Sequence, residues 1–195
     1  MELNIDFFKI TDQQVAQKGR VLISEPFLND TYFKRSVVLL TEHTKDGSVG
    51  FVLNKQVDLK VQDVIQDFPE IDASICIGGP VNTNTIHYIH TLGNLIPESV
   101  HVIKDIYWGG NFDILKEMIS AGAVKQHQVR FFLGYAGWGA SQLEDELAEN
   151  AWLVVELSPE IIMKAESANT WNVILEKMNN KYQVWANFPE NPGLN

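Results

Sequence analysis

The strongest constraint on the fold is a pair of apolar segments, rich in β-branched residues, that flank a short turn sequence. The segments are Ser36–Thr41 and Ser48–Leu53, and Lys45-Asp46-Gly47 lies between them. β-Branched residues favour strands, and an Asp-Gly step favours a tight reversal of the chain, so the sequence predicts a β-hairpin. Because its strands are apolar almost throughout, we expect both faces to be covered, with Gly50 at a bulge or at a close approach of another backbone.

Further strands and helices follow without regular alternation. Strands are predicted at Ile75–Ile77, Thr85–Leu92, Ser99–Val102, Ile106–Trp108, Val129–Leu133 and Trp152–Leu157. Helices are predicted at Asp58–Phe68, at Asn111–Ala121 before Gly122, at Ser141–Asn150, from Ser158-Pro159 onward and at Thr170–Met178. Several consecutive strands disfavour a doubly wound parallel sheet. The pattern indicates an α+β protein with a mixed sheet or partly closed barrel flanked by helices.

Length and composition indicate one folded domain over residues 1–195, with an N-terminal extension at 1–18 and an irregular tail at 187–195. The composition is 45% hydrophobic and 21% charged, which is typical of globular proteins. The single cysteine, Cys76, lies in an apolar run, which predicts a buried, unreactive thiol without an internal disulfide. The start lacks signal-peptide features, and no run reaches the roughly 18 apolar residues of a membrane span. We therefore expect a cytoplasmic protein.

The charge balance disfavours nucleic acid as a direct partner. The chain has 25 acidic and 15 basic residues, for a net charge of -10, and Lys34-Arg35 is the only adjacent basic pair. DNA binders usually neutralise several phosphates with clustered Lys and Arg side chains. Weak nucleic-acid binding is therefore kept only as the third hypothesis.

The densest chemical signal is the glycine-rich segment from Gly134 to Glu144. We interpret it as a turn that leads from a strand into a helix, and such a turn leaves backbone N–H groups free to bind an anion or carboxylate. Tyr135 and Trp138 are expected to form an aromatic wall beside these donors. The candidate ligand or partner surface comprises Tyr135, Gly137, Trp138, Gln142 and Glu146.

Structural explanations of the same segment stay open. Ser141 and Glu144 match the S-x-x-E capping box, in which each side chain bonds the backbone at the start of a helix. Gly137 and Gly139 begin a G-x-G pattern, but Gln142 stands where a dinucleotide fingerprint has its third glycine. We therefore expect no nucleotide or other cofactor. The chain also lacks a G-x-S-x-G nucleophile turn.

The histidines suggest an alternative, enzymatic site. A hydrolase-type pocket is hypothesised from His43, Asn54, Gly79 and His90. A metal site at His43, His87 and His90, with Asp30, Glu42 or His101 as further ligands, is disfavoured. His87 and His90 are three residues apart on a predicted strand, so their side chains point to opposite faces. We expect no bound metal.

Several blocks of the sequence together resemble the AlgH/YqgE family of bacterial proteins. The blocks are Gly19–Pro26, Asp30 with Phe33 and Arg35–Val38, Glu42-His43, Gly47, Gly50, Leu53-Asn54, Gly78–Val81 with His90, Gly134–Trp138, Gln142–Glu144, Glu146-Leu147, Trp152 and Asn191–Asn195. The last block resembles Bacteroidetes members. Ala140, and Gln56 after Lys55, depart from the usual family pattern.

The resemblance implies a largely antiparallel, bifurcated sheet curled into a pseudo-barrel. One pseudomonad member is associated with transcriptional regulation of alginate synthesis, but the family is largely uncharacterised and gives no catalytic residues to carry over. We therefore expect a non-enzymatic binding or regulatory protein that acts through a protein partner or a small ligand. The hydrolase-type pocket and weak nucleic-acid binding are the alternatives.

Overall fold

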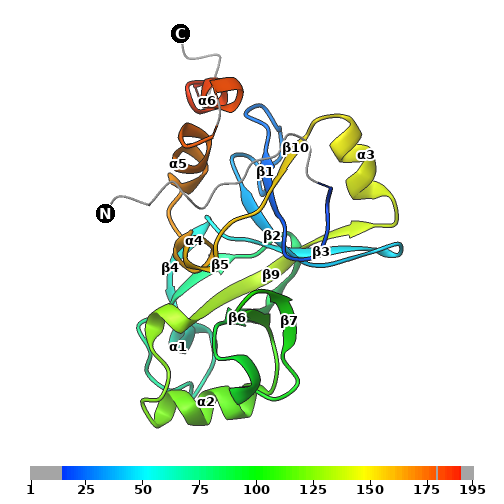
Figure 1. The fold of residues 1–195 in the computed structure, drawn as a ribbon. Coiled ribbons are helices and arrows are strands. Elements are labelled where there is room, and N and C mark those ends of the chain that lie inside the picture. Colours follow the sequence, from blue (N-terminus) through cyan, green and yellow to red (C-terminus); the bar gives the residue numbers. More distant parts are fainter. Residues whose placement is uncertain (1–14, 179, 190–195) are drawn as a thin grey trace.

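The computed structural model describes residues 15–178 and 180–189 and is built on a ten-stranded sheet (Figure 1). The strands are β1 (Val21–Ser24), β2 (Val37–Thr44), β3 (Gly47–Val52), β4 (Gln56–Lys60), β5 (Ser74–Ile77), β6 (Val81–His90), β7 (Val100–Ile103), β8 (Ile106–Trp108), β9 (Val129–Gly139) and β10 (Trp152–Val155). The helices are α1 (Val61–Val64), α2 (Phe112–Ser120), α3 (Gln142–Ala148), α4 (Pro159–Lys164), α5 (Thr170–Glu176) and α6 (Asn180–Ala186), and 3₁₀ turns lie at Gly93–Leu95 and Gln126–Gln128. Hydrogen-bonded neighbours follow the order β10-β1-β2-β3-β9-β6-β8-β7, with β4 and β5 off this path.

The predicted hairpin is confirmed as β2 and β3. The two strands pair antiparallel from Val38 opposite Val52 to Thr44 opposite Gly47, with one register shift between Leu40 and Glu42. Gly50 lies where the backbones approach closely, because a Cβ atom there would be 2.7 Å from the Leu39 carbonyl oxygen. Both strands are buried over most of their length, as the apolar sequence predicts.

The sheet divides at β9. β3 pairs antiparallel with residues 136–139 of β9, whereas β5 pairs parallel with residues 131–133. β6 pairs antiparallel with β9 over residues 129–135. The sheet is thus bifurcated and largely antiparallel, which confirms the α+β prediction, and it is not closed over the described residues.

Two glycines make the division sterically feasible. The Gly78 N–H donates to the Leu133 carbonyl and its own carbonyl accepts from Val52 N–H, both at 2.8 Å, so Gly78 lies between β3 and β9. A Cβ atom on Gly79 would lie 2.3 Å from the Tyr135 carbonyl carbon, far inside van der Waals contact. The branch point therefore requires residues without side chains.

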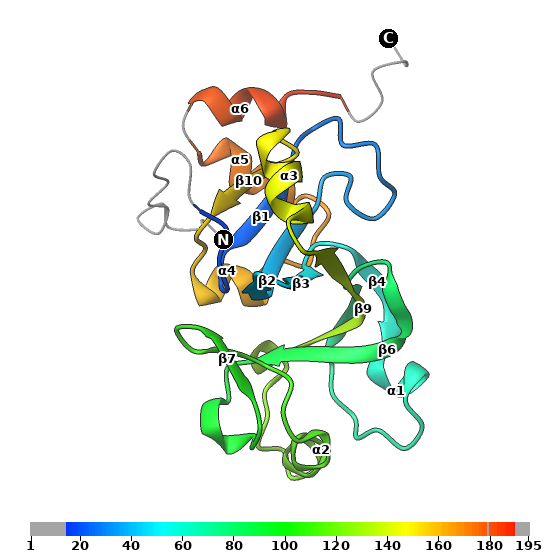
Figure 2. The same cartoon turned by 90° about the vertical axis from the view of Figure 1, so that its right-hand side faces the viewer.

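Buried side chains form three hydrophobic cores, and β9 contributes to all of them. Phe132 belongs to the first core, Phe131 to the second and Trp138 to the third. Successive residues of a strand point to opposite faces, so Phe131 and Phe132 enter different cores. Figures 1 and 2 show α4, α5 and α6 on one side of β9 and α2 on the other. The helices are held by the buried side chains of Ile162, Trp171 and Tyr182 in the first core, Leu115 in the second and Leu143 in the third.

The predicted N-terminal caps of two helices, α2 and α4, are confirmed. The Asn111 side chain accepts a hydrogen bond from Ile114 N–H at 3.1 Å at the start of α2. The Ser158 hydroxyl accepts from Ile161 N–H at 3.4 Å, with proline in the first turn of α4. Within the described ranges, no helix is both long enough and apolar enough to cross a bilayer.

Other predictions of elements are wrong. The predicted helix Asp58–Phe68 is helical only at Val61–Val64, because residues 58–60 belong to β4, where Lys60 pairs with Ser74. Pairing with β5 outweighs the local helical spacing. β9 continues to Gly139, well beyond the predicted end at Leu133, and α6 was not predicted. Residues 1–14 of the predicted extension and 190–195 of the predicted tail lie outside the described residues.

Candidate functional site

The glycine-rich segment is a paired strand over residues 134–139, so the predicted turn with free N–H donors is wrong. Gly137 and Trp138 pair with β3 and Tyr135 with β6, and the Gly139 N–H donates to the Gln142 side chain at 3.0 Å. Trp138 is only 5% exposed, so it forms no aromatic wall for a ligand. Tyr135 is half-buried, and Gly137 and Gln142 are exposed; a surface role for these three residues stays a prediction.

Glu146 holds α3 against the sheet. Its Oε2 accepts from the indole N–H of Trp138 at 2.9 Å and of Trp152 at 2.7 Å. Gln142 donates to Oε1 at 3.0 Å. Phe33 packs on both indoles, with ring centroids 5.8 and 5.5 Å away. Glu146 thus satisfies the two largely buried indole N–H groups, and this stabilising role accounts for Trp138 and Glu146 without a ligand.

The predicted capping box does not form. Ser141 takes a left-handed conformation with φ 63°, and its side chain makes no capping hydrogen bond. Glu144 instead lies opposite His43, with Oε1 3.6 Å from Nε2. The other ring nitrogen of His43, Nδ1, is 2.7 Å from the Ser48 hydroxyl. His43 thus links the hairpin to α3.

The hypothesised hydrolase pocket is not assembled. His43 pairs across the hairpin with Ser48, which in turn pairs with Trp138 near the end of β9. His90 pairs with Val129 at the start of β9. That separation is nine residues, about 30 Å along the strand at roughly 3.3 Å per residue. The described residues also contain no cluster of three or more His, Cys, Asp or Glu side chains suited to a metal ion.

Asn54 and Gly79, the other residues of that pocket, have structural roles. Asn54 is 1% exposed; it accepts from Val37 N–H and donates to the Arg35 carbonyl, both at 2.9 Å. It thereby fixes the start of β2. Gly79 lies at the branch of the sheet, where it contacts the backbone of β9.

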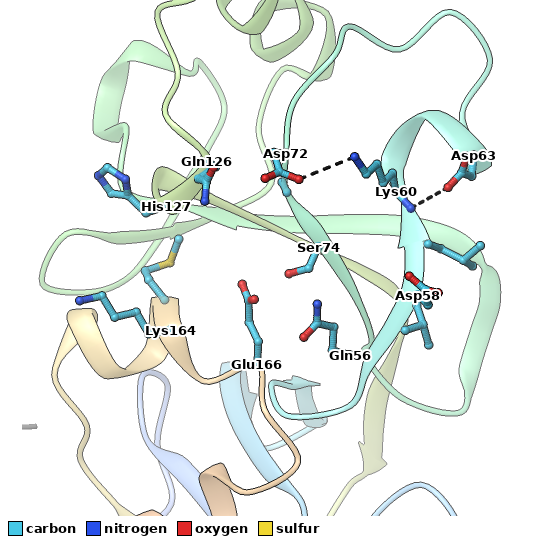
Figure 3. Close-up of a pocket in the computed structure, with 14 residues that line it drawn as sticks. Gln56, Asp58, Lys60, Asp63, Asp72, Ser74, Gln126, His127, Lys164 and Glu166 are labelled. Carbon is cyan, nitrogen blue, oxygen red and sulfur yellow. Dashed lines mark hydrogen bonds and ion pairs between the residues drawn. The ribbon is translucent and has the colours of Figure 1, made fainter. Parts of the chain in front are cut away.

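A cavity of about 720 Å³ between the β4–β5 branch and α4 is the strongest candidate binding site. It brings together three separate parts of the chain, residues 56–74, 126–127 and 163–166. Figure 3 shows Gln56, Ser74 and Glu166 in the middle of the cavity, with Lys164 and Lys60 on opposite sides. The lining consists of Gln56, Val57, Asp58, Leu59, Lys60, Asp63, Asp72, Ala73, Ser74, Gln126, His127, Met163, Lys164 and Glu166.

Arg130 fixes the wall that α4 forms. Its side chain is 2% exposed, and its Nε lies 3.8 Å from the Glu166 carboxylate, so this carboxylate faces a buried positive charge. The guanidinium donates to the carbonyls of Leu53 at 2.6 Å, of Ala165 at 3.5 Å and of Ile162. A guanidinium can satisfy several acceptors from different directions. Arg130 therefore ties the end of β3 to α4 and positions Glu166 in the cavity.

The cavity is open to solvent along its polar side, where Gln56, Asp58 and Gln126 are exposed and Ser74 is half-buried. Within the described part of the chain, the side chains of Gln56, Asp58, Ser74 and Gln126 line it without a hydrogen bond or ion pair of their own. Lys60 Nζ, in contrast, lies 3.8 Å from Asp72, and Lys164 Nζ donates to Glu160 at 2.7 Å. Amide, hydroxyl and carboxylate groups that are not used internally are suited to binding a polar molecule.

Sequence reasoning missed this cavity because no motif marks it. Its residues come from distant segments that meet only after β5 pairs with both β4 and β9. One signal was present: Gln56, Asp58 and Lys60 alternate with Val57 and Leu59, which is the period of a strand with one polar face. The alternation was not recognised because the helical spacing of apolar residues after Asp58 was extended back over residues 58–60.

The fold and the cavity define the class, an α+β protein with a bifurcated sheet and a polar cleft beside the branch. The sequence model of the AlgH-like family matches residues 21–183, and the chain belongs to this family. A UPF0301 protein of Bacteroides thetaiotaomicron is 42% identical, over 100% of both chains. A UPF0301 protein of Chlorobaculum tepidum is 41% identical, over 93% of this chain and 97% of the relative.

Solved structures agree with the fold. The crystal structure of protein DIP2367 from Corynebacterium diphtheriae has a TM-score of 0.76 at 20% identity, and the match covers 93% of this chain and 97% of that one. The solution structure of AlgH from Pseudomonas aeruginosa has a TM-score of 0.70 at 25% identity, with 92% and 98% coverage. The resemblance seen in the sequence is thus confirmed for family and fold.

Proposed function

We propose that this protein is a non-enzymatic binding protein that holds a small polar ligand in the cavity between β4, β5 and α4. The observation that carries the proposal is the set of unused polar side chains, Gln56, Asp58, Ser74 and Gln126, gathered in one cavity of about 720 Å³. Small-molecule sites of this size usually place a few polar groups so that they converge on the ligand.

The charges of the lining favour a ligand with a positively charged group. Four carboxylates, Asp58, Asp63, Asp72 and Glu166, line the cavity with two lysines, Lys60 and Lys164. The buried Arg130 faces Glu166, so one negative charge is in excess. The net charge of the whole chain, -10, has the same sign. Opposite charge raises the local concentration of a ligand and its rate of association. A small amine that also carries hydroxyl or amide groups matches both the charge and the free hydrogen-bonding groups.

A regulatory role, as the family resemblance suggests, would pass through such a ligand or through a protein partner. Direct binding to DNA is disfavoured because the chain carries 25 acidic against 15 basic residues, and duplex DNA repels an acidic surface. This part of the proposal predicts no retention on double-stranded DNA at about 150 mM salt, the range in which non-specific complexes weaken.

Isothermal titration with putrescine, spermidine and glucosamine tests the site, with glucose and glutarate as neutral and anionic counterparts. We expect saturable binding of at least one amine and none of glutarate. Asp58→Asn and Gln56→Ala should each weaken amine binding by roughly tenfold, the loss of one polar contact. Asp46→Asn, an exposed carboxylate in the hairpin turn, is the matched control. Binding of no amine, or wild-type affinity in both cavity variants, would refute the proposal.

A further inference from the structure

Glu166 differs from the other carboxylates of the polar cavity because it is half-buried. Its side chain is 35% exposed, whereas Asp58, Asp63 and Asp72 are all exposed. Two of these are also engaged with Lys60: Asp63 accepts from its backbone N–H at 2.8 Å, and Asp72 lies 3.8 Å from its Nζ. Water and salt screen a charge less when it is partly buried. A charged group of the ligand would therefore interact most strongly with Glu166.

The Glu166 carboxylate keeps its capacity to accept hydrogen bonds. The 3.8 Å between its Oε1 and Arg130 Nε is longer than a hydrogen bond, and the guanidinium donates to backbone carbonyls instead. Among the described residues, the carboxylate has this ion pair and no hydrogen bond. Because Arg130 is buried, a ligand ammonium on the cavity side would lie closer to the carboxylate than to the guanidinium.

Gln56 and Ser74 provide further acceptors around Glu166. Figure 3 shows the three side chains in the middle of the cavity. The carboxylate, the Gln56 amide oxygen and the Ser74 hydroxyl oxygen can each accept a hydrogen bond, and a primary ammonium group has three N–H donors. A quaternary ammonium group has the same charge and no N–H donor.

The lining lacks the aromatic surface that binds quaternary ammonium groups. Among the described residues that line the cavity, none is phenylalanine, tyrosine or tryptophan, and the exposed His127 has the one ring. Proteins recognise quaternary ammonium ions mainly with aromatic cages, in which the faces of the rings attract the charge. The cavity therefore favours a nitrogen that carries N–H groups over one that is fully methylated.

We propose that the ligand of this cavity is a primary amine, and that Glu166 is the residue that selects its ammonium group. The inference rests on the proposed function, because it concerns the same cavity, and it narrows the ligand from a small cation to one with N–H donors. Glu166 accepts one N–H in a charge-assisted hydrogen bond. Gln56 and Ser74 accept the other two.

Isothermal titration with matched pairs of amines tests this selection. Putrescine, spermidine and glucosamine are each compared with the counterpart in which every nitrogen is methylated to a quaternary ammonium, so that the N–H donors are removed and the positive charge is kept. We expect methylation to weaken the binding of an amine by roughly tenfold or more, the effect of a lost hydrogen bond to a charged group.

Glu166→Gln distinguishes selection by hydrogen bonding from exclusion by size. The variant keeps the shape of the side chain, so a preference that arises from the bulk of the methyl groups would persist. We expect the preference for the primary amine to fall by roughly tenfold. Glu176→Gln, the same change at an exposed glutamate outside the cavity, should leave the preference unchanged.

Glu166→Asp separates recognition from folding. It keeps the charge that faces Arg130 and withdraws the carboxylate from the cavity by one methylene group, so the preference should fall while the melting temperature stays close to that of the wild type. The inference alone is overturned if an amine binds and Asp58→Asn weakens it, but methylation has no effect or both Glu166 variants keep the full preference. Binding of no amine would refute the proposed function, and this inference with it.

Discussion

At the residue scale, the surroundings of His90 fix both its tautomer and its charge. Its Nδ1 accepts from Leu92 N–H at 3.2 Å, and its Nε2 lies 3.0 Å from the Gly109 carbonyl oxygen, which can only accept. The proton of the neutral ring is therefore on Nε2, and protonation of Nδ1 would break the bond to Leu92. Burial lowers the pKa of His90, although the Gly109 carbonyl partly opposes this shift.

The lowered pKa of His90 predicts a pH-dependent stability. In the unfolded chain His90 binds a proton near its usual pKa of 6.5, whereas the folded protein resists this protonation. The unfolded state therefore binds more protons below that pH, and folding is favoured less. We expect the free energy of unfolding by urea to be lower at pH 5.5 than at pH 7.5, with the decrease centred where the pH falls through 6.5.

His90→Gln isolates the contribution of this side chain. The variant should show a smaller decrease in stability between pH 7.5 and 5.5 than the wild type. Part of the dependence should persist, because burial also lowers the pKa of His87. His127→Gln, which alters an exposed histidine, should leave the pH profile unchanged. Identical profiles for His90→Gln and the wild type would show that His90 does not cause the effect.

At the element scale, β9 organises the molecule because three strands pair with it. β3 and β5 share one edge in succession, and β6 takes the other. The change of partner takes place at Gly78 and Gly79, whose missing side chains let the backbones meet. The length and burial of β9 also explain why its glycine-rich end, which sequence reasoning placed in a turn, forms part of the sheet.

The branch predicts a sharp difference between two glycine substitutions. Gly79→Ala should destabilise the protein by on the order of 3 kcal/mol, because its Cβ would lie 2.3 Å from the Tyr135 carbonyl carbon. Gly139→Ala should change stability by less than about 1 kcal/mol, because the nearest atom to its Cβ is the Gln142 Oε1 at 4.0 Å. Urea unfolding of both variants measures the difference; equal stabilities would contradict this account of the branch.

At the scale of the whole molecule, Arg130 joins parts of the chain that are far apart in sequence. It is buried in the sheet and donates to carbonyls at the end of β3 and in and after α4. Its cation also faces Cys76, whose pKa is raised by burial even though Arg130 lowers it. The predicted buried thiol is confirmed, with Cys76 1% exposed.

Replacing Arg130 by lysine should loosen α4 without removing the charge. A lysine ammonium cannot reach the same set of carbonyls as a planar guanidinium. We expect Arg130→Lys to lower the free energy of unfolding by roughly 2 kcal/mol and to speed amide hydrogen exchange in α4. Arg20→Lys, which alters the half-buried partner of Glu156, serves as the control. Unchanged exchange in α4 would show that Arg130 does not hold this helix.

The sequence by itself determined the family, the α+β class, the hairpin β2–β3 and the caps of α2 and α4. The hairpin and the caps depend on neighbouring residues, such as the Asp46-Gly47 step or the Asn111 side chain, whose preferences act over a few positions. The family and the class follow from sequence blocks and predicted elements along the whole chain. Tertiary structure alone decided that residues 56–60 form a strand, that Trp138 is buried against Glu146, and that the polar cavity exists. These outcomes depend on pairing and packing between segments tens of residues apart, whose free energy exceeds local preference. Of the three, only the strand at residues 56–60 has a periodic trace in the sequence, the alternation of polar and apolar residues.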